Sequence, residues 1–134
     1  MNRHRFVLLY SFGAGLGDAL TGVLLLAAPA ATLQLMHVPV PAGELIWLRW
    51  MGVFVGAVGL SYLLPWRLPA PARLAELTVV WRFTAVVRGA VAVFVIGALL
   101  AAALPRAWLT VGLWDGLLAG LQVALLRAGW LTHD

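Results

Sequence analysis

The chain has 134 residues, of which 63% are hydrophobic and 10% are charged, and its mean hydropathy is +0.99. A soluble domain carries about 25% charged residues and at this size cannot hide so much apolar surface, so the composition excludes a soluble domain and indicates a protein surrounded by lipid. The net charge of +4 comes from scattered arginines, which excludes a nucleic-acid-binding surface, and the lack of cysteine excludes disulfides and thiolate metal sites.

Four segments are long and apolar enough to cross a membrane as helices. A spanning helix needs about 20 predominantly apolar residues, and such stretches lie at residues 6–28, 45–64, 78–104 and 107–128. The seven prolines all fall between these stretches, as expected for a residue that breaks the helical hydrogen-bond ladder. The sequence therefore predicts an all-α integral membrane protein with a single transmembrane domain over residues 1–134.

The first of these segments also has features of a signal peptide. Arg3 and Arg5 precede the apolar run, and Ala28-Pro29-Ala30 follows it. The run is longer than the usual apolar core of a signal peptide and contains Asp18, so we expect an uncleaved first helix.

The connections between the segments are short. The first, residues 29–44, is apolar but too short to span again, so we expect a short interfacial segment there. The second, residues 65–77, is rich in proline, and the third is a tight turn around Pro105. Because short connections make consecutive helices antiparallel neighbours, we predict an antiparallel up-and-down bundle of four helices.

Arginine is concentrated on one side of the predicted bundle. That side carries Arg3, Arg5, Arg67, Arg73 and Arg127, with Arg82 just inside the third segment. The other side carries Arg106, with Arg49 near a helix end. By the positive-inside rule, this bias predicts a multi-pass protein of the bacterial cytoplasmic (inner) membrane with its N- and C-termini in the cytoplasm.

Four charged residues lie inside the predicted spans: Asp18, Arg49, Arg88 and Asp115. A charge at the bilayer centre costs at least about 2.5–3.5 kcal/mol on insertion scales, so such residues pair or face an interior cavity. At the rise of an α-helix, Asp18, Arg88 and Asp115 reach nearly one level in a core about 30 Å thick, and Arg49 lies one or two turns nearer the outer end. We therefore predict an intramembrane binding site formed by these four charges.

The residues that share helix faces with these charges are small or polar. They include Ser11, Gly15 and Gly22 near Asp18, Gly52 and Gly56 near Arg49, Thr84 and Ala85 near Arg88, and Gly112 and Gln122 near Asp115. Gly52-x-x-x-Gly56 and Gly116-x-x-x-Gly120 also fit the small-xxx-small pattern of close helix packing. Two interpretations stay open: a polar pocket for a ligand head group or a proton relay, and a buried ion-pair network that only fixes the helix arrangement.

The sequence offers no clear catalytic group. The three histidines, His4, His37 and His133, lie outside the predicted spans, so we expect neither a haem nor a metal site. Ser11 and Ser61 have no histidine partner at depth, which argues against nucleophilic catalysis. No cofactor is evident, and a quinone or a lipid is the ligand class that suits a pocket inside a membrane.

The same polar positions carry a resemblance to a known family. Gly17-Asp18 in the first span, Leu48-Arg49-Trp50-Met51-Gly52 in the second, Arg88 in the third and Asp115 in the fourth resemble the DoxX-like superfamily of small four-helix bacterial membrane proteins. The resemblance covers most of the chain through hydropathy and isolated polar positions. It implies a four-helix bundle. Some members of that superfamily are associated with quinone-linked oxidoreductases, and others act as membrane accessory or assembly factors.

Three functions fit these features, and we rank them in the following order. The first is a membrane binding or accessory protein whose charged pocket holds a hydrophobic small molecule or a partner helix. The second is a small transporter or proton-coupled permease, which would need to oligomerise because four helices are few for a transport path. The third is a quinone-linked oxidoreductase subunit with an external redox partner. The expected partners are the lipid bilayer and a membrane protein or a second copy of this chain, and not nucleic acid.

Overall fold

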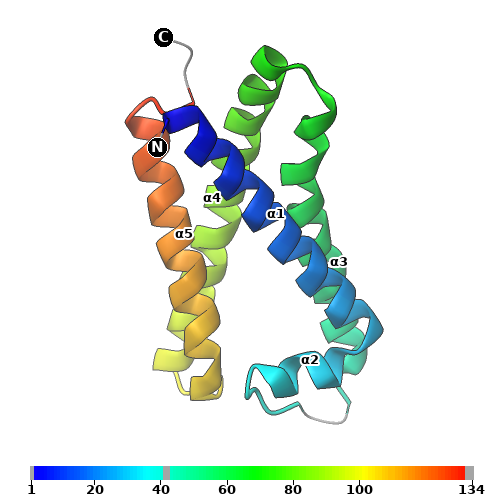
Figure 1. Cartoon of the computed structure of the whole chain (residues 1–134). Coiled ribbons are helices and arrows are strands. Elements are labelled where there is room, and N and C mark those ends of the chain that lie inside the picture. Colours follow the sequence, from blue (N-terminus) through cyan, green and yellow to red (C-terminus); the bar gives the residue numbers. More distant parts are fainter. Residues whose placement is uncertain (1, 41–42, 132–134) are drawn as a thin grey trace. The chain divides into compact units, whose positions relative to one another are not determined.

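The computed structural model describes residues 2–40 and 43–131, and these form helices without any strand (Figure 1). In chain order the elements are α1 (Arg3–Ala27), α2 (Pro29–Leu35), α3 (Leu45–Leu63), the 3-10 helix η1 (Leu64–Arg67), α4 (Ala70–Leu100), the 3-10 helix η2 (Arg106–Trp108) and α5 (Leu109–Arg127). The predicted all-α class is confirmed. Pro41 and His133, which were predicted to lie outside the spans, fall outside the described residues.

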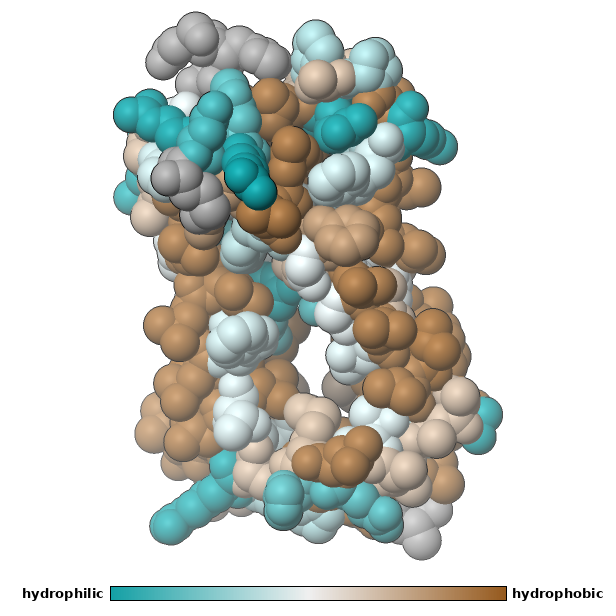
Figure 2. Space-filling view, viewed as in Figure 1, coloured by the Kyte–Doolittle hydropathy of each residue, from teal (hydrophilic) through white to brown (hydrophobic). Residues whose placement is uncertain are grey.

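Four helical segments are long and apolar enough to cross a membrane: Arg3–Ala27, Leu45–Arg67, Ala70–Leu100 and Arg106–Arg127. Large apolar side chains are exposed on each of them, for example Leu20, Ile46, Val93 and Leu117. In Figure 2, hydrophobic residues cover the middle of the helices and hydrophilic residues gather toward their ends. Apolar surface of this extent requires a lipid environment, so the chain is a multi-pass membrane protein.

The third long helix differs most from its predicted boundaries, because α4 begins at Ala70 rather than at residue 78 and ends at Leu100 rather than at residue 104. Pro71 therefore lies inside a helix, in its first turn, where the missing N–H would have had no helical acceptor. At the other end, Ala102 adopts a left-handed backbone with a φ of 54°. The amides of Ala102 and Ala103 return to the carbonyls of Leu99 and Ala98, which closes the helix as a Schellman motif.

The predicted short segment after the first span is α2, a helix of seven residues. Pro29 is its first residue, where a fixed φ and a missing N–H suit helix initiation. His37 ends it in the left-handed region with a φ of 57°. The helix contacts both α1 and α3, which suits a segment that lies across their ends (Figure 1).

The chain divides into two compact units, Met1–Arg73 and Leu74–Asp134. In the first unit, α1 and α3 pack closely through glycine. A Cβ on Gly22 would lie 2.5 Å from the backbone of Gly56, and a Cβ on Gly59 would collide with the backbone nitrogen of Ala19. Because later positions of α1 meet earlier positions of α3, the two helices run in opposite directions. The pattern Gly52-x-x-x-Gly56 thus serves packing inside this unit.

In the second unit, α4 and α5 lie side by side (Figure 1). A Cβ on Gly112 of α5 would lie 3.1 Å from the side chain of Val95 on α4, and one on Gly116 would lie 3.5 Å from Ala92. Nothing lies within 4 Å of such an atom on Gly120, so only the first glycine of the pattern Gly116-x-x-x-Gly120 contributes to this helix contact. The predicted single domain over the whole chain stays a prediction.

Candidate functional site

Two of the four predicted site residues meet in the second unit. Arg88, past the midpoint of α4, donates a hydrogen bond through Nη1 to Oδ1 of Asp115 on α5 at 2.5 Å, and the two groups form an ion pair. The Arg88 side chain is 6% exposed and that of Asp115 is 17% exposed. Both side chains are therefore largely buried, although the Asp115 side chain stays partly exposed.

The position of this pair follows from helix periodicity. Arg88 belongs to the buried stripe of α4, which also contains Trp81, Thr84 and Ala92 at spacings of three and four residues. Charge-assisted hydrogen bonds are shorter and roughly twice as strong as neutral ones, and an opposite charge offsets part of the cost of placing each ion in an apolar medium. A positive and a negative residue on facing helices thus stabilise each other at a depth where either alone would be costly.

A second polar contact lies beside the ion pair. Gln122 of α5 donates through Nε2 to Oγ1 of Thr84 on α4 at 3.0 Å, and both side chains are fully buried. The Thr84 hydroxyl donates in turn to the carbonyl oxygen of Val80 at 2.8 Å. The two contacts together place four polar side chains between otherwise apolar helices.

Thr84 and Gln122 were not among the predicted site residues, although the sequence carried a signal for both. Thr84 precedes Arg88 by one helical turn, and Gln122 follows Asp115 by two turns, so each shares a face with a charge. The face of α4 that carries Thr84 and Arg88 meets the face of α5 that carries Gln122 and Asp115. Thr84 contacts Gln122, and Arg88 contacts Asp115. The pairing of Thr84 with Gln122 depends on the register of the two helices, which spacing within one helix does not define.

The other two predicted site residues lie in the first unit. Asp18 is partly buried on α1, whereas Arg49 is exposed on α3 and forms no ion pair with any residue in the described part of the chain. The buried stripe of α3 runs through Leu48, Gly52 and Gly59, so Arg49 lies on its flank. A single site that contains all four charges stays a prediction.

Within residues 2–40 and 43–131, no group of three or more histidine, cysteine, aspartate or glutamate residues could hold a metal ion. What the arrangement around Arg88 and Asp115 offers is hydrogen bonding: guanidinium donors, carboxylate acceptors, and an amide and a hydroxyl that are both donor and acceptor. Comparison of the chain with protein-family models, with curated proteins and with solved structures found no match.

Proposed function

We propose that this chain is a small binding or accessory protein of the bacterial inner membrane, whose site around Arg88 and Asp115 holds the polar head of a hydrophobic molecule, such as a quinone or a lipid. In this proposal the four long helices form one antiparallel bundle with both termini in the cytoplasm. The role agrees with what the resemblance to the DoxX-like superfamily implies for accessory members.

The observation that carries the proposal is the partly accessible ion pair between α4 and α5. One carboxylate oxygen of Asp115 accepts from Arg88, and an ionised carboxylate has lone pairs for further donors. A hydroxyl group on a membrane-soluble molecule, such as a quinol or a lipid hydroxyl, matches this acceptor. The apolar side chains that surround the pair suit the rest of such a molecule.

The same site would also accept a polar side chain from a partner helix. Small residues and polar side chains are the usual means by which helices associate in membranes. The two ligands differ in one measurable respect, because a small molecule is extracted by organic solvent and a partner helix is not.

The proposal is tested by mass spectrometry of the small molecules that co-purify with the protein after extraction in a mild detergent. The wild type is compared with Asp115→Asn, which keeps the shape of the side chain but removes its charge. We expect a stoichiometric hydrophobic molecule in the wild type and roughly tenfold less of it in the variant, as for the loss of a hydrogen bond to a charged group.

The matched control is Arg106→Gln, which removes an exposed arginine of η2 away from the site. This variant should retain the molecule at the wild-type level. A wild type that carries no specific molecule, or an Asp115→Asn protein that retains it fully, would contradict binding at this site. A quinone as the retained molecule would favour a subunit of a quinone-linked oxidoreductase over a lipid-binding accessory protein.

A further inference from the structure

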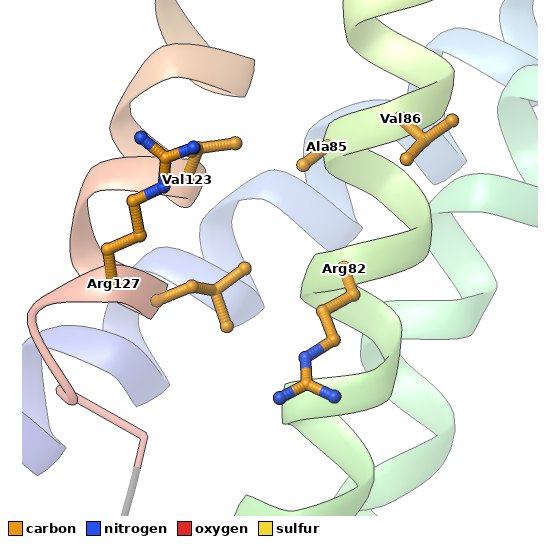
Figure 3. A pocket seen from close by; sticks show the side chains of 6 residues that line it. Arg82, Ala85, Val86, Val123 and Arg127 are labelled. Atoms are coloured by element: carbon orange, nitrogen blue, oxygen red, sulfur yellow. The ribbon is translucent and has the colours of Figure 1, made fainter.

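The second unit contains an open groove between α4 and α5, away from the ion pair. Its volume is about 450 Å³, within the range of about 300–1,000 Å³ that small-molecule pockets occupy. The lining residues are Arg82, Ala85 and Val86 of α4 and Val123, Leu126 and Arg127 of α5 (Figure 3). Each helix thus contributes one arginine and two apolar side chains.

The two arginines of the groove have no acidic partner in the described part of the chain. Both are exposed, and neither guanidinium group forms an ion pair or a hydrogen bond within that part of the chain. Arg73 provides a contrast, because its Nη2 donates to the carbonyl oxygen of Leu68 at 2.9 Å and its guanidinium lies 5.1 Å from the ring centroid of Trp66. Arg82 and Arg127 therefore concentrate positive charge that an anion would neutralise.

The groove combines two arginines with apolar walls. Ala85 and Val86 lie about one turn from Arg82 in the direction of Arg88, and Val123 lies one turn from Arg127 in the direction of Asp115. In Figure 3 the Arg82 side chain extends away from Ala85 and Val86, whereas the Arg127 side chain extends back along α5 to lie beside Val123. Each arginine therefore lies close to apolar lining of the groove.

The backbone of Arg127 lies nearer to the level of lipid head groups than that of Arg82 does. Along the helix axis, Arg82 lies roughly 9 Å from Arg88, and Arg127 lies roughly 18 Å from Asp115. If the ion pair lies at the midplane of a core about 30 Å thick, the backbone of Arg127 lies near the membrane surface, and the long side chain of Arg82 extends toward that surface.

We propose that this groove binds an anionic phospholipid, with the phosphate held by Arg82 and Arg127 and an acyl chain against Ala85, Val86 and Val123. Guanidinium groups bind phosphate oxygens through paired hydrogen bonds, and basic pockets between transmembrane helices bind anionic head groups. The two arginine side chains extend in different directions in Figure 3, so binding of one phosphate by both requires rotation about the flexible bonds of these side chains. The site uses none of the residues of the Arg88–Asp115 site, so each proposal can fail without the other.

The test is lipid retention by protein reconstituted in bilayer nanodiscs that contain equal amounts of phosphatidylglycerol and phosphatidylcholine with the same acyl chains. After extraction in detergent, native mass spectrometry gives the ratio of the two lipids that stay bound. The wild type should retain phosphatidylglycerol in preference. The double variant Arg82→Gln with Arg127→Gln should lower that retention roughly tenfold, as expected for the loss of charge-assisted contacts.

Two further variants make the result specific. Arg106→Gln removes an arginine outside the groove and should leave the ratio unchanged. Val86→Trp keeps both charges, and the larger side chain fills part of the groove from a position where the valine is 72% exposed. This variant should therefore lower lipid retention. It also tests the groove if the double variant does not fold. Three outcomes would overturn the proposal. They are equal retention of the two lipids by the wild type, full retention of phosphatidylglycerol by the double variant or by Val86→Trp, and displacement of the lipid by excess inorganic phosphate.

Discussion

Arg88 and Asp115 occupy positions in long apolar helices at which a single unpaired charge would be costly. Their hydrogen bond joins α4 to α5, and the buried pair of Thr84 and Gln122 lies beside it. The two contacts differ in what they contribute. The ion pair compensates two charges, whereas the Gln122 amide adds a neutral hydrogen bond to a hydroxyl that already donates to Val80.

This difference predicts a modest effect for a change at Gln122. Gln122→Leu keeps the volume of the side chain and removes its donor to Thr84. We expect a loss of stability of about 0.6 kcal/mol and no more than about 1.7 kcal/mol, the range measured for hydrogen bonds between membrane helices. Reversible unfolding in a denaturing detergent measures this loss of unfolding free energy. A loss as large as that of Asp115→Asn would show that the Gln122 amide contributes more to stability than one neutral hydrogen bond.

The α1–α3 contact and the α4–α5 contact are made by different kinds of residue. In the first unit the α1–α3 contact depends on glycine, because a side chain at Gly59 would collide with the backbone of Ala19. In the second unit the α4–α5 contact combines apolar side chains with the polar residues of the candidate site. Close packing through glycine and hydrogen bonds between polar side chains both contribute to helix association in membranes.

The glycine contact predicts opposite outcomes for two substitutions of the same kind. Gly59→Ala forces the backbones of α1 and α3 apart and should cost about 1–3 kcal/mol, the usual range for overpacking. Gly13→Ala, on the same pair of helices, meets nothing within 4 Å and should instead stabilise its helix by about 0.5–1 kcal/mol. The thermal stability of both variants in the same detergent measures this, and equal effects would mean that α1 and α3 do not approach as closely as described.

Much of this element-level structure could be predicted from the sequence. Apolar stretches of membrane length identified the four long helices, and spacing within each helix placed Arg88 and Asp115 on interior faces. The start of α4 was missed because Pro71 was interpreted as a helix breaker, although a first turn tolerates it. Arg49 is exposed on α3 because the buried stripe of that helix passes through Leu48, and its part in a site with the other three charges stays a prediction.

At the scale of the whole molecule, the distribution of arginine determines which sides of the membrane the chain ends occupy in the proposed bundle. An even number of spans returns the C-terminus to the side of the N-terminus. Arg67 should then share that side with both ends, and Arg106 should lie on the opposite side.

The natural lack of cysteine makes this topology directly testable, since any cysteine introduced is the single one. We expect Asn2→Cys, Arg67→Cys and Ala128→Cys to react with a membrane-impermeant maleimide only after the membrane is permeabilised. Arg106→Cys should react in intact spheroplasts. Labelling of Asn2→Cys and Ala128→Cys from opposite sides would contradict four spans.

Arg88 and Asp115 are a charged pair within two long apolar helices, and this pair is central to the proposed function. A double-mutant cycle of Arg88→Gln, Asp115→Asn and the combined variant, followed by reversible unfolding in a denaturing detergent, tests it directly. Each single variant leaves one charge without its partner and should lose about 3–5 kcal/mol. The combined variant, which has neither charge, should be more stable than the sum of the single losses implies by at least about 1 kcal/mol. Additive losses would show that the two residues do not interact and would contradict the account.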